Sequence, residues 1–321
     1  MSVSLTTRRE ALKLAGAAAI GSLAPSALQA AAPMLGVLRP QVHRFKVGSF
    51  EVTNILDGYR IGPGPHPIFG NDQSPETVQA YAKQHGLAPD KLETVFVNTV
   101  VNTGRELVLF DTGNGKGRMP TAGNLPEGLA AAGYKPEQVD VVVITHGHPD
   151  HIGGLMADGK PAFPNARYVF GEAEFDYWKK GDVGEARKAN REQFMQVAAP
   201  LAEKATFLKG GGEVVPGIRA VEAFGHTPGM LAFHIESEGR RVLNWADVAN
   251  NSIFAIQQPD WHVGFDADKA AGVATRRRIF DMVSSERIAV TGYHMPFPAL
   301  GYVEKVGTSY RWLPVSSQFH I

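Results

Sequence analysis

Short apolar runs separated by glycine, proline and polar residues predict that strands and helices alternate along the chain. Residues 42–56 alternate between apolar and polar side chains, which predicts two short strands around a central Gly-Ser turn. Residues 57–70 are rich in glycine and proline and are expected to form a loop. Residues 75–85 are predicted to be helical, because Ser74 can cap the first turn and proline suits the first helical position.

The same alternation continues through the rest of the chain in two halves. Strands are predicted over residues 94–102, 106–111, 139–145, 167–170, 206–208, 218–223, 230–236, 241–244 and 288–292, and helices over residues 122–132, 171–180, 185–204 and 268–284. Two sheets that face each other, with helices on the outside, accommodate this order of elements. No internal repeat and no long linker occurs, so residues 33–321 are expected to form a single domain.

The composition limits the chemistry that the chain can carry. It has 321 residues and no cysteine, which excludes disulfides, thiolate zinc sites, iron–sulfur clusters and a cysteine nucleophile. Any metal must therefore be held by histidine, aspartate and glutamate. Lysine and arginine total 32, as do aspartate and glutamate, so no overall charge attracts nucleic acid. No nucleic-acid partner is expected.

The first 32 residues are interpreted as an export signal rather than as part of the fold. The pair Arg8-Arg9 belongs to a segment that resembles a twin-arginine signal, and an apolar stretch follows it up to about Leu23. Ala30-x-Ala32 fits a cleavage site. The apolar stretch is too short for a permanent membrane anchor. The mature protein is therefore expected in the periplasm or outside the cell, without contact to a membrane.

The strongest chemical signal lies in the segment Thr145-His146-Gly147-His148-Pro149-Asp150-His151. It follows the apolar run 139–144, so its polar side chains come at the end of a predicted buried strand. Imidazole and carboxylate together suit zinc and similar divalent ions. A strand end can hold such ligands rigidly at the edge of a sheet, which predicts a metal site. The alternative interpretation is a loop that is merely polar.

Other polar residues follow apolar strands in the same manner. They are Asp111, His226, Asp247 and His294. Each has a simpler interpretation when it is taken alone, such as a turn residue for Asp111 or a helix N-cap for Asp247. Strand ends from two sheets can meet at one edge, where loops carry chemistry. The joint occurrence of these residues with the histidine cluster favours one shared metal site.

The order His-x-His-x-Asp-His, a later histidine, an aspartate and a final histidine resembles the metallo-β-lactamase superfamily, over about residues 42–315. Within that superfamily the chain is similar to the methyl parathion hydrolase group, which sits beside the acyl-homoserine lactone lactonases. The similar segments include residues 111–113, 132–140, 153–156, 163–166 and 215–218. The resemblance implies an α/β fold, the αβ/βα four-layer sandwich, with two mixed β-sheets covered by helices. Met230 departs from the family pattern, in which histidine is common at this position.

The resemblance also implies which residues bind metal. One ion would be held by His146, His148 and His226, and a second by Asp150, His151 and His294. Asp247 would bridge the two ions, and Asp111 would orient a ligand histidine. The ions are expected to be zinc, and manganese, cobalt and iron remain open because histidine and carboxylate ligands accept them too.

A pair of such ions would share a bridging hydroxide, which predicts a hydrolase of neutral esters, lactones or phosphotriesters. Asp150 and Asp247 are the catalytic candidates, because either carboxylate could transfer a proton. No cluster of lysine or arginine lies near the motifs in the sequence, which favours neutral substrates. The alternatives are a dedicated acyl-homoserine lactone lactonase, a mononuclear iron thiol dioxygenase and a non-catalytic metal-binding protein.

Aromatic side chains are expected to line the substrate pocket. The candidates are Trp178, Phe194 and Phe297, and Trp178 is favoured because the resembling group places an aromatic residue near this segment. The loop over residues 62–70 could form a lid or a dimer contact. A small-molecule substrate is the expected partner, and the resemblance implies a homodimer.

Overall fold

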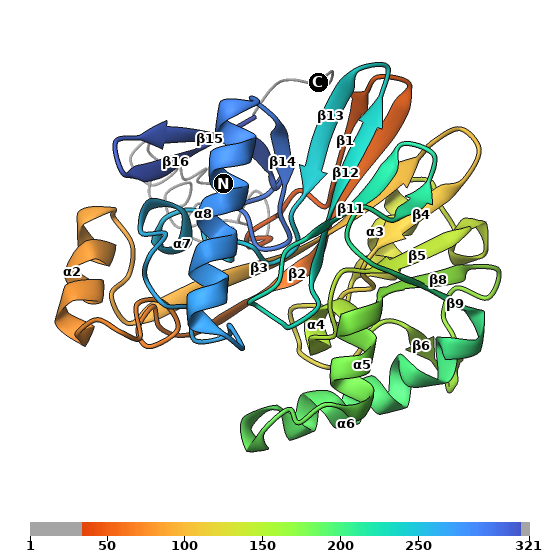
Figure 1. Ribbon diagram of the computed structural model, residues 1–321, viewed down its shortest axis with the longest axis horizontal. Coiled ribbons are helices and arrows are strands. Elements are labelled where there is room, and N and C mark those ends of the chain that lie inside the picture. Colours follow the sequence, from red (N-terminus) through yellow and green to blue (C-terminus); the bar gives the residue numbers. More distant parts are fainter. Residues whose placement is uncertain (1–33, 316–321) are drawn as a thin grey trace, which may run out of the picture. The chain divides into compact units, whose positions relative to one another are not determined.

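Both sheets predicted from the hydrophobic pattern are present in the computed structural model, which describes residues 34–315 (Figure 1). Residues 34–39 have no regular structure and belong to a separate unit, residues 1–39. All described helices and strands belong to the second unit, residues 40–321. The predicted export signal lies outside the described residues. Among residues 34–315, no helix is long and apolar enough to cross a bilayer.

The first sheet has seven strands and changes from antiparallel to parallel along its width. In spatial order it contains β1 (Val42–Val47), β2 (Phe50–Pro63), β3 (Lys91–Asn102), β4 (Leu107–Phe110), β5 (Val141–Ile144), β8 (Arg167–Gly171) and β9 (Ala205–Leu208). Neighbouring strands from β1 to β4 are antiparallel, and those from β4 to β9 are parallel. The sheet is therefore mixed, as the resemblance implies.

The second large sheet also has seven strands. In spatial order it contains β10 (Glu213–Val215), β11 (Ile218–Glu222), β12 (Leu231–Ser237), β13 (Arg240–Asn244), β14 (Ala289–Thr291), β15 (Leu300–Val306) and β16 (Ser309–Pro314). Only the pairing of β13 with β14 is parallel in this sheet. A small separate sheet joins β6 (Met156–Ala157) to β7 (Lys160–Pro161).

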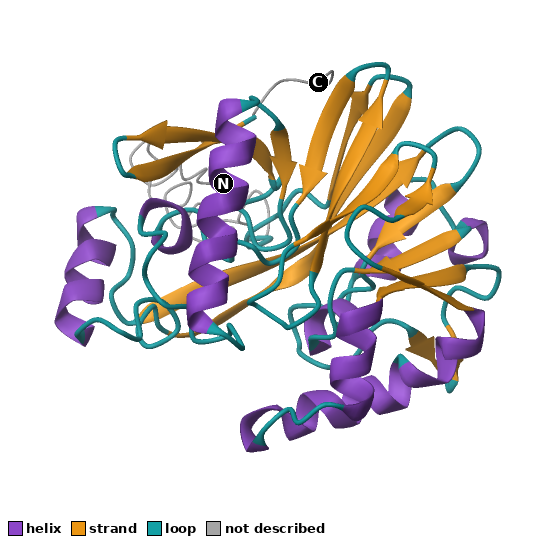
Figure 2. Ribbon diagram, in the orientation of Figure 1, coloured by secondary structure: helices purple, strands orange, loops and turns teal. Residues whose placement is uncertain are grey.

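Helices connect the strands and are coloured purple in Figure 2. The α-helices are α2 (Pro75–Gln84), α3 (Leu125–Ala131), α4 (Pro149–Ile152), α5 (Glu172–Lys180), α6 (Lys188–Val197), α7 (Phe254–Gln257) and α8 (Lys269–Ser285). Short 3-10 helices occupy η1 (Pro136–Gln138), η2 (Glu185–Arg187) and η3 (Ala199–Lys204). The predicted cap is confirmed, because the Ser74 side chain accepts a hydrogen bond from the Thr77 backbone N–H.

Alternation of side chains along the strands produces four layers. In β5, Val141 and Val143 belong to the core between the two sheets, which also contains Phe233 of β12. Their neighbours Val142 and Ile144 point the other way, into a second core with side chains of α3, α5 and α6. A third core packs α8 against the second sheet. The expected αβ/βα sandwich is therefore confirmed.

One expected loop is partly a strand. Strand β2 continues to Pro63, where the prediction placed a loop from residue 57, because β3 pairs with it along its whole length. A bulge between Leu56 and Gly58 interrupts the register without ending the strand. Gly58 has φ +153°, and a Cβ there would lie 2.2 Å from the Thr121 carbonyl oxygen. The glycine thus allows the close approach that lets the strand continue.

Candidate metal centre

Five strand ends supply the predicted ligands. Asp111 follows β4 and His146 follows β5, and these two strands are parallel. His226, Asp247 and His294 follow β11, β13 and β14, which run in one direction in the second sheet. The two edges are joined directly, since the Leu231 backbone N–H donates to the Thr145 carbonyl oxygen at 3.1 Å. Ligands far apart in sequence therefore meet at one rim of the sandwich.

Three histidines form the first group. The Nδ1 atom of His148 lies 2.9 Å from Nε2 of His226 and 3.1 Å from Nε2 of His146. All three side chains are buried. This is the group that the resemblance assigned to one ion, and its ring nitrogens are close enough to share a single cation.

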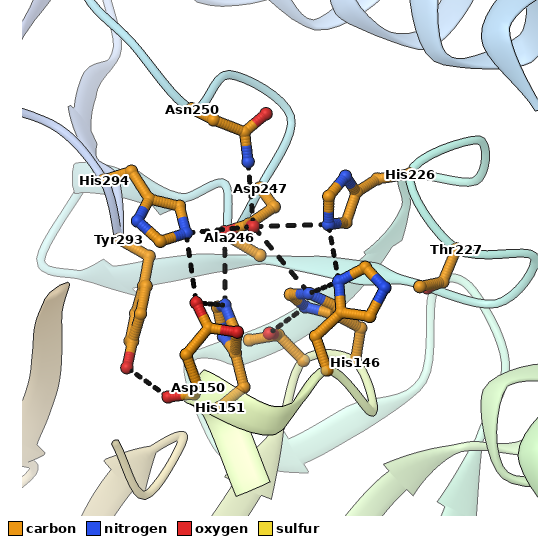
Figure 3. Close-up of polar contacts among 12 residues, drawn as sticks. His146, Asp150, His151, His226, Thr227, Ala246, Asp247, Asn250, Tyr293 and His294 are labelled. Carbon is orange, nitrogen blue, oxygen red and sulfur yellow. Dashed lines mark hydrogen bonds and ion pairs between the residues drawn. The ribbon is translucent and has the colours of Figure 1, made fainter. Parts of the chain in front are cut away.

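Asp247 lies between the first group and the second, as Figure 3 shows with His226 and His294 on either side of it. Its Oδ2 is 3.3 Å from His226 Nε2 and 3.2 Å from His294 Nε2, while its Oδ1 is 3.4 Å from His151 Nε2. The second group also contains Asp150, whose Oδ2 is 3.6 Å from His151 and 3.5 Å from His294. The structure thus brings all seven predicted ligands together, with Asp247 in the bridging position.

Hydrogen bonds on the outside of the site orient most of the imidazole rings. Nδ1 of His151 contacts Asp111 at 2.8 Å, Nδ1 of His226 contacts Asp266 at 3.0 Å, and Nδ1 of His294 contacts the Val95 carbonyl oxygen at 2.8 Å. Each contact places the N–H of the neutral ring outside, so the Nε2 lone pair points into the site. Asp111 therefore has the orienting position that was predicted for it.

The inward atoms fit a bound cation better than they fit each other. They present lone pairs to one another at about 3 Å, and too few hydrogens are available to bridge them. The buried atoms His151 Nε2 and Asp247 Oδ1 have no hydrogen-bond partner within residues 34–315. Buried polar atoms without partners are costly, and a divalent cation would satisfy both. The donor set, imidazole with carboxylate, suits zinc.

Charge in the site favours the same conclusion. Burial lowers the pKa of His146 and of His148 well below the ordinary value, which keeps both rings in the neutral form that binds metals. Burial lowers the pKa of His151 and of His294, but the neighbouring carboxylates, Asp247 first, outweigh it and raise both pKa values above the ordinary one. Burial alone would raise the pKa of Asp247, but these two histidines outweigh it and lower that pKa well below its ordinary value. A cation bound at the Nε2 atoms would take the place of the protons that the raised histidine pKa values favour. A charged carboxylate in this buried position requires a positive partner.

Glu174 of α5 has a structural role that the sequence did not reveal. It is 1% exposed and accepts hydrogen bonds from the backbone N–H groups of Gly147 and Gly229 at 2.8 and 3.0 Å. The Thr227 hydroxyl and the Trp178 indole N–H also donate to it, both at 2.6 Å. One carboxylate thus fixes both the His146–His148 loop and the His226 loop. In the sequence it resembles any solvated helix carboxylate.

Asp266 is a second residue that was missed. One carboxylate oxygen faces His226 Nδ1, and the other accepts from Arg276 Nη2 at 3.0 Å. Asp266 and Arg276 are each 1% exposed. A signal for the pair does exist in the sequence, because Arg276 shares a helix face with the apolar positions Ile279 and Val283. A charge on an apolar face indicates a buried partner.

A cleft of about 330 Å³ opens over the ligands His148, Asp150, His226, Asp247 and His294. Its apolar wall consists of Ile68, Phe69, Leu92, Phe96, Met119 and Phe265. The segment over residues 62–70 contributes to this wall.

The aromatic residues predicted for the pocket lie elsewhere. Trp178 and Phe194 are fully buried and stack on each other at 6.2 Å beneath Gly147, where a Cβ would lie 2.4 Å from the indole nitrogen. Phe297 packs against the core of the second sheet. The prediction was therefore wrong for all three side chains. They were chosen by residue type and by resemblance, which do not distinguish a core aromatic from a pocket aromatic.

The sequence has no cluster of lysine or arginine near the motifs, which favoured neutral substrates, but the fold brings three arginines to the cleft. Arg60, Arg118 and Arg187 line the cleft, although 127 positions separate the first from the last in the sequence. They come from β2, from the loop after β4 and from η2. A search for local clusters of lysine and arginine cannot find charges that only the fold brings together.

The model of the metallo-beta-lactamase superfamily matches residues 93–282, which include six of the seven candidate ligands. The chain belongs to the metallo-beta-lactamase superfamily. Among curated relatives, an N-acyl homoserine lactonase of Bacillus cereus is 26% identical over 159 residues, which are 50% of this chain and 57% of the relative. The chain thus spans little more than half the length of that relative.

Two solved structures of the superfamily extend the likeness to almost the whole of the described chain. The structure of the hydrolase AbOPH, in the beta lactamase superfamily, has a TM-score of 0.80 at 25% identity and covers 88% of this chain and 100% of its own. The structure of AidC, a dizinc quorum-quenching lactonase with a bound product, has a TM-score of 0.79 at 24% identity. It covers 86% of this chain and 98% of its own.

Proposed function

We propose that this protein is a hydrolase of carboxylic esters or lactones that depends on two divalent metal ions, with zinc as the first candidate. The observation that carries the proposal is the convergence of six nitrogen- and oxygen-bearing side chains around a seventh, Asp247, at the floor of an open cleft. The similarity to lactonases supports the hydrolysis of cyclic esters, and the similarity to a dizinc lactonase supports the binding of two zinc ions.

The two ions would be held by two groups of side chains that share one carboxylate. His146, His148 and His226 would hold one, Asp150, His151 and His294 the other, and Asp247 would contact both. When bound, such ions supply positive charge that acidifies water and polarises a carbonyl group. The fixed Nδ1 hydrogen bonds of His151, His226 and His294 keep the ligand atoms in place, so little reorganisation is needed during the reaction.

Of the two catalytic candidates, Asp150 is better placed to move a proton. It lines the cleft and its side chain is 20% exposed, whereas that of Asp247 is 3% exposed. Asp247 Oδ2 also accepts a hydrogen bond from Asn250 at 2.9 Å. We assign to the Asp150 carboxylate the uptake of a proton from the attacking water and its transfer to the leaving alcohol, and to Asp247 the positioning of ligands.

A dedicated acyl-homoserine lactone lactonase is the second candidate. The curated relatives that bear this name favour it, and the apolar wall of the cleft can receive an acyl chain. Export by the twin-arginine route and formation of a homodimer are further proposals, based on the residues near Arg8-Arg9 and on the family likeness.

A substrate panel with metal analysis tests the proposal. The panel contains acyl-homoserine lactones, simple lactones, aryl esters and a phosphotriester, each measured as kcat/KM on protein of known metal content. We expect hydrolysis of the esters and lactones to exceed that of the phosphotriester. Inactivity on every member of the panel by protein that carries two metal ions per chain would refute the proposed function.

A further inference from the structure

Three arginines line the cleft that opens over the candidate metal centre. Arg60, Arg118 and Arg187, here called the arginine wall, line it together with the ligands Asp150 and His294. Arg60 and Arg118 are exposed and Arg187 is half-buried, so all three reach solvent.

The position of Arg60 follows from the register of β2 and β3. Arg60 pairs with Thr94, and the next pair but one joins Gly62 to Leu92. Residues two apart on a strand share a face, and all four of these residues line the cleft. Because β2 continues into the segment that was expected to be a loop, Arg60 lies on the face of the β2–β3 pair that lines the cleft.

Neutral acceptors hold the other two arginines. Nη1 of Arg118 donates to Asn114 Oδ1 at 3.0 Å, and Asn114 is itself fixed by Asp57, which accepts from its backbone N–H and its side chain. Nη2 of Arg187 donates to the Asp266 carbonyl oxygen at 3.2 Å. A guanidinium has five N–H donors, so most of them stay available to a ligand.

No ion pair within the described part of the chain neutralises the arginine wall. Within residues 34–315, none of the three arginines has a carboxylate oxygen within 4.0 Å. The carboxylates that line the cleft are Asp150 and Asp247, and both face the histidines of the candidate metal centre. Three positive charges therefore meet any molecule that enters, and guanidinium binds carboxylate and phosphate groups in bidentate fashion.

We propose that the natural substrate is an ester or lactone that carries a second, anionic group, a carboxylate or a phosphate, which the arginine wall binds. This inference rests on the proposed hydrolase function. The hydrolysable bond would lie over the ligand cluster, the apolar body against Leu92, Phe96 and Phe265, and the anionic group against the arginines. Substrates of this kind arise where one carboxyl group of a dicarboxylic acid is esterified and the other is free.

Matched esters test the proposal. The 4-nitrophenyl monoester of adipic acid and the same ester with a terminal carboxamide differ only in charge, and a third ester with a terminal phosphonate distinguishes phosphate from carboxylate as the natural group. We expect kcat/KM to be roughly tenfold or more higher for a charged ester than for the carboxamide, because hydrogen bonds between charged groups are strong. The preference should lie in KM and should weaken as salt is raised.

Variants of the arginine wall locate the effect. In the triple variant Arg60→Gln, Arg118→Gln, Arg187→Gln, the ratio of kcat/KM for the charged ester to kcat/KM for the carboxamide should fall from roughly tenfold to about one. Arg105→Gln is the matched control, because Arg105 is exposed in the turn before β4, at the strand end remote from Asp111. A preference that survives in the triple variant, or that disappears in the control, overturns the proposal.

A binding measurement separates this inference from the proposed function. Calorimetry compares adipate with its monoamide, both of which have one carboxylate for the metal centre, so their affinity ratio reports the second carboxylate. We expect the wild type to bind adipate roughly tenfold more tightly than the monoamide. The triple variant should bind the two probes with equal affinity. A wild type that hydrolyses the esters but binds both probes equally overturns the anion site alone. A wild type that prefers adipate but hydrolyses no ester overturns the proposed function alone.

Discussion

The ligand cluster of seven side chains is almost entirely buried, whereas the arginine wall that lines the same cleft reaches solvent, with Arg60 and Arg118 exposed and Arg187 half-buried. His146 and His151 have no exposed surface and each is held by a hydrogen bond at its Nδ1 atom, while Arg60 reaches solvent. The ends of strands from two sheets hold the cluster, whereas the three arginines come from strand β2, the loop after β4 and the 3-10 helix η2. Under the two proposals above, the buried ligand cluster would set the chemistry and the arginine wall would select the substrate.

Removal of the shared ligand should have the largest effect. Asp247→Ala takes away the carboxylate that lies near both groups of ligands, so we expect kcat/KM to fall by roughly a hundredfold or more. This loss should exceed that caused by mutating a residue that only hydrogen-bonds to a ligand histidine. Asp90→Ala, an exposed residue before β3, should leave kcat/KM unchanged. Steady-state kinetics and metal content on both variants check the prediction, and a fully active Asp247→Ala protein contradicts it.

The buried ion pair behind His226 should contribute more to stability than its exposed neighbour. Asp266→Asn leaves the buried Arg276 charge with backbone carbonyl partners but without a carboxylate, so the free energy of unfolding should fall by about 3 kcal/mol. Asp260→Asn breaks the Asp260–Arg277 pair, whose side chains are 63% and 34% exposed, and should cost less than about 1 kcal/mol. Urea unfolding measures both, and equal losses would show that burial does not distinguish the pairs.

The Glu174 carboxylate should matter for metal affinity rather than for the substrate. In Glu174→Gln an N–H₂ group would face the donors Thr227 and Gly229, so both ligand loops would loosen and zinc affinity should fall by roughly tenfold. Competition with a chromophoric chelator measures it. Glu172→Gln, on the same helix but exposed and paired with Lys209, should bind zinc as the wild type does. An unchanged affinity in Glu174→Gln would mean that the loops hold their shape without it.

The smallest effect should come from the apolar wall of the cleft. Phe265 is 44% exposed and lines the cleft, so Phe265→Ala should raise KM for apolar acyl esters by a few-fold and change the free energy of unfolding by about 0.5 kcal/mol or less. Phe207→Ala is the control, because Phe207 is 40% exposed on β9 and does not line the cleft. Similar KM values in both variants would show that Phe265 makes no contact with substrate.

The ligand cluster was predictable because short stretches of sequence contain both its ligands and the strands that position them. Apolar strands that each end in a polar residue predict both the sheets and the edge at which the strand ends meet. Residues 146–151 alone supply four of the seven ligands. Asp111 was found in the same way. The fold was also predictable, since strand periodicity depends on burial that each segment shows by itself.

The wall of the cleft was not predictable, because it depends on contacts between distant segments. Arg60 faces the cleft only because β2 continues past the bulge at Gly58, and the glycine-rich composition of this segment indicated a loop. Trp178 has the residue type of a pocket side chain but supports Gly147 from the core. Neither periodicity nor composition states which side of a loop meets solvent.

Dependence on two metal ions is decided by the metal content of the purified protein, measured together with its esterase and lactonase activity before and after chelation. We expect two divalent ions per chain, loss of activity when they are removed, and recovery when two equivalents of zinc are returned. A single ion per chain would rule out the shared position of Asp247, and full activity in protein stripped of metal would rule out a metal-dependent hydrolase.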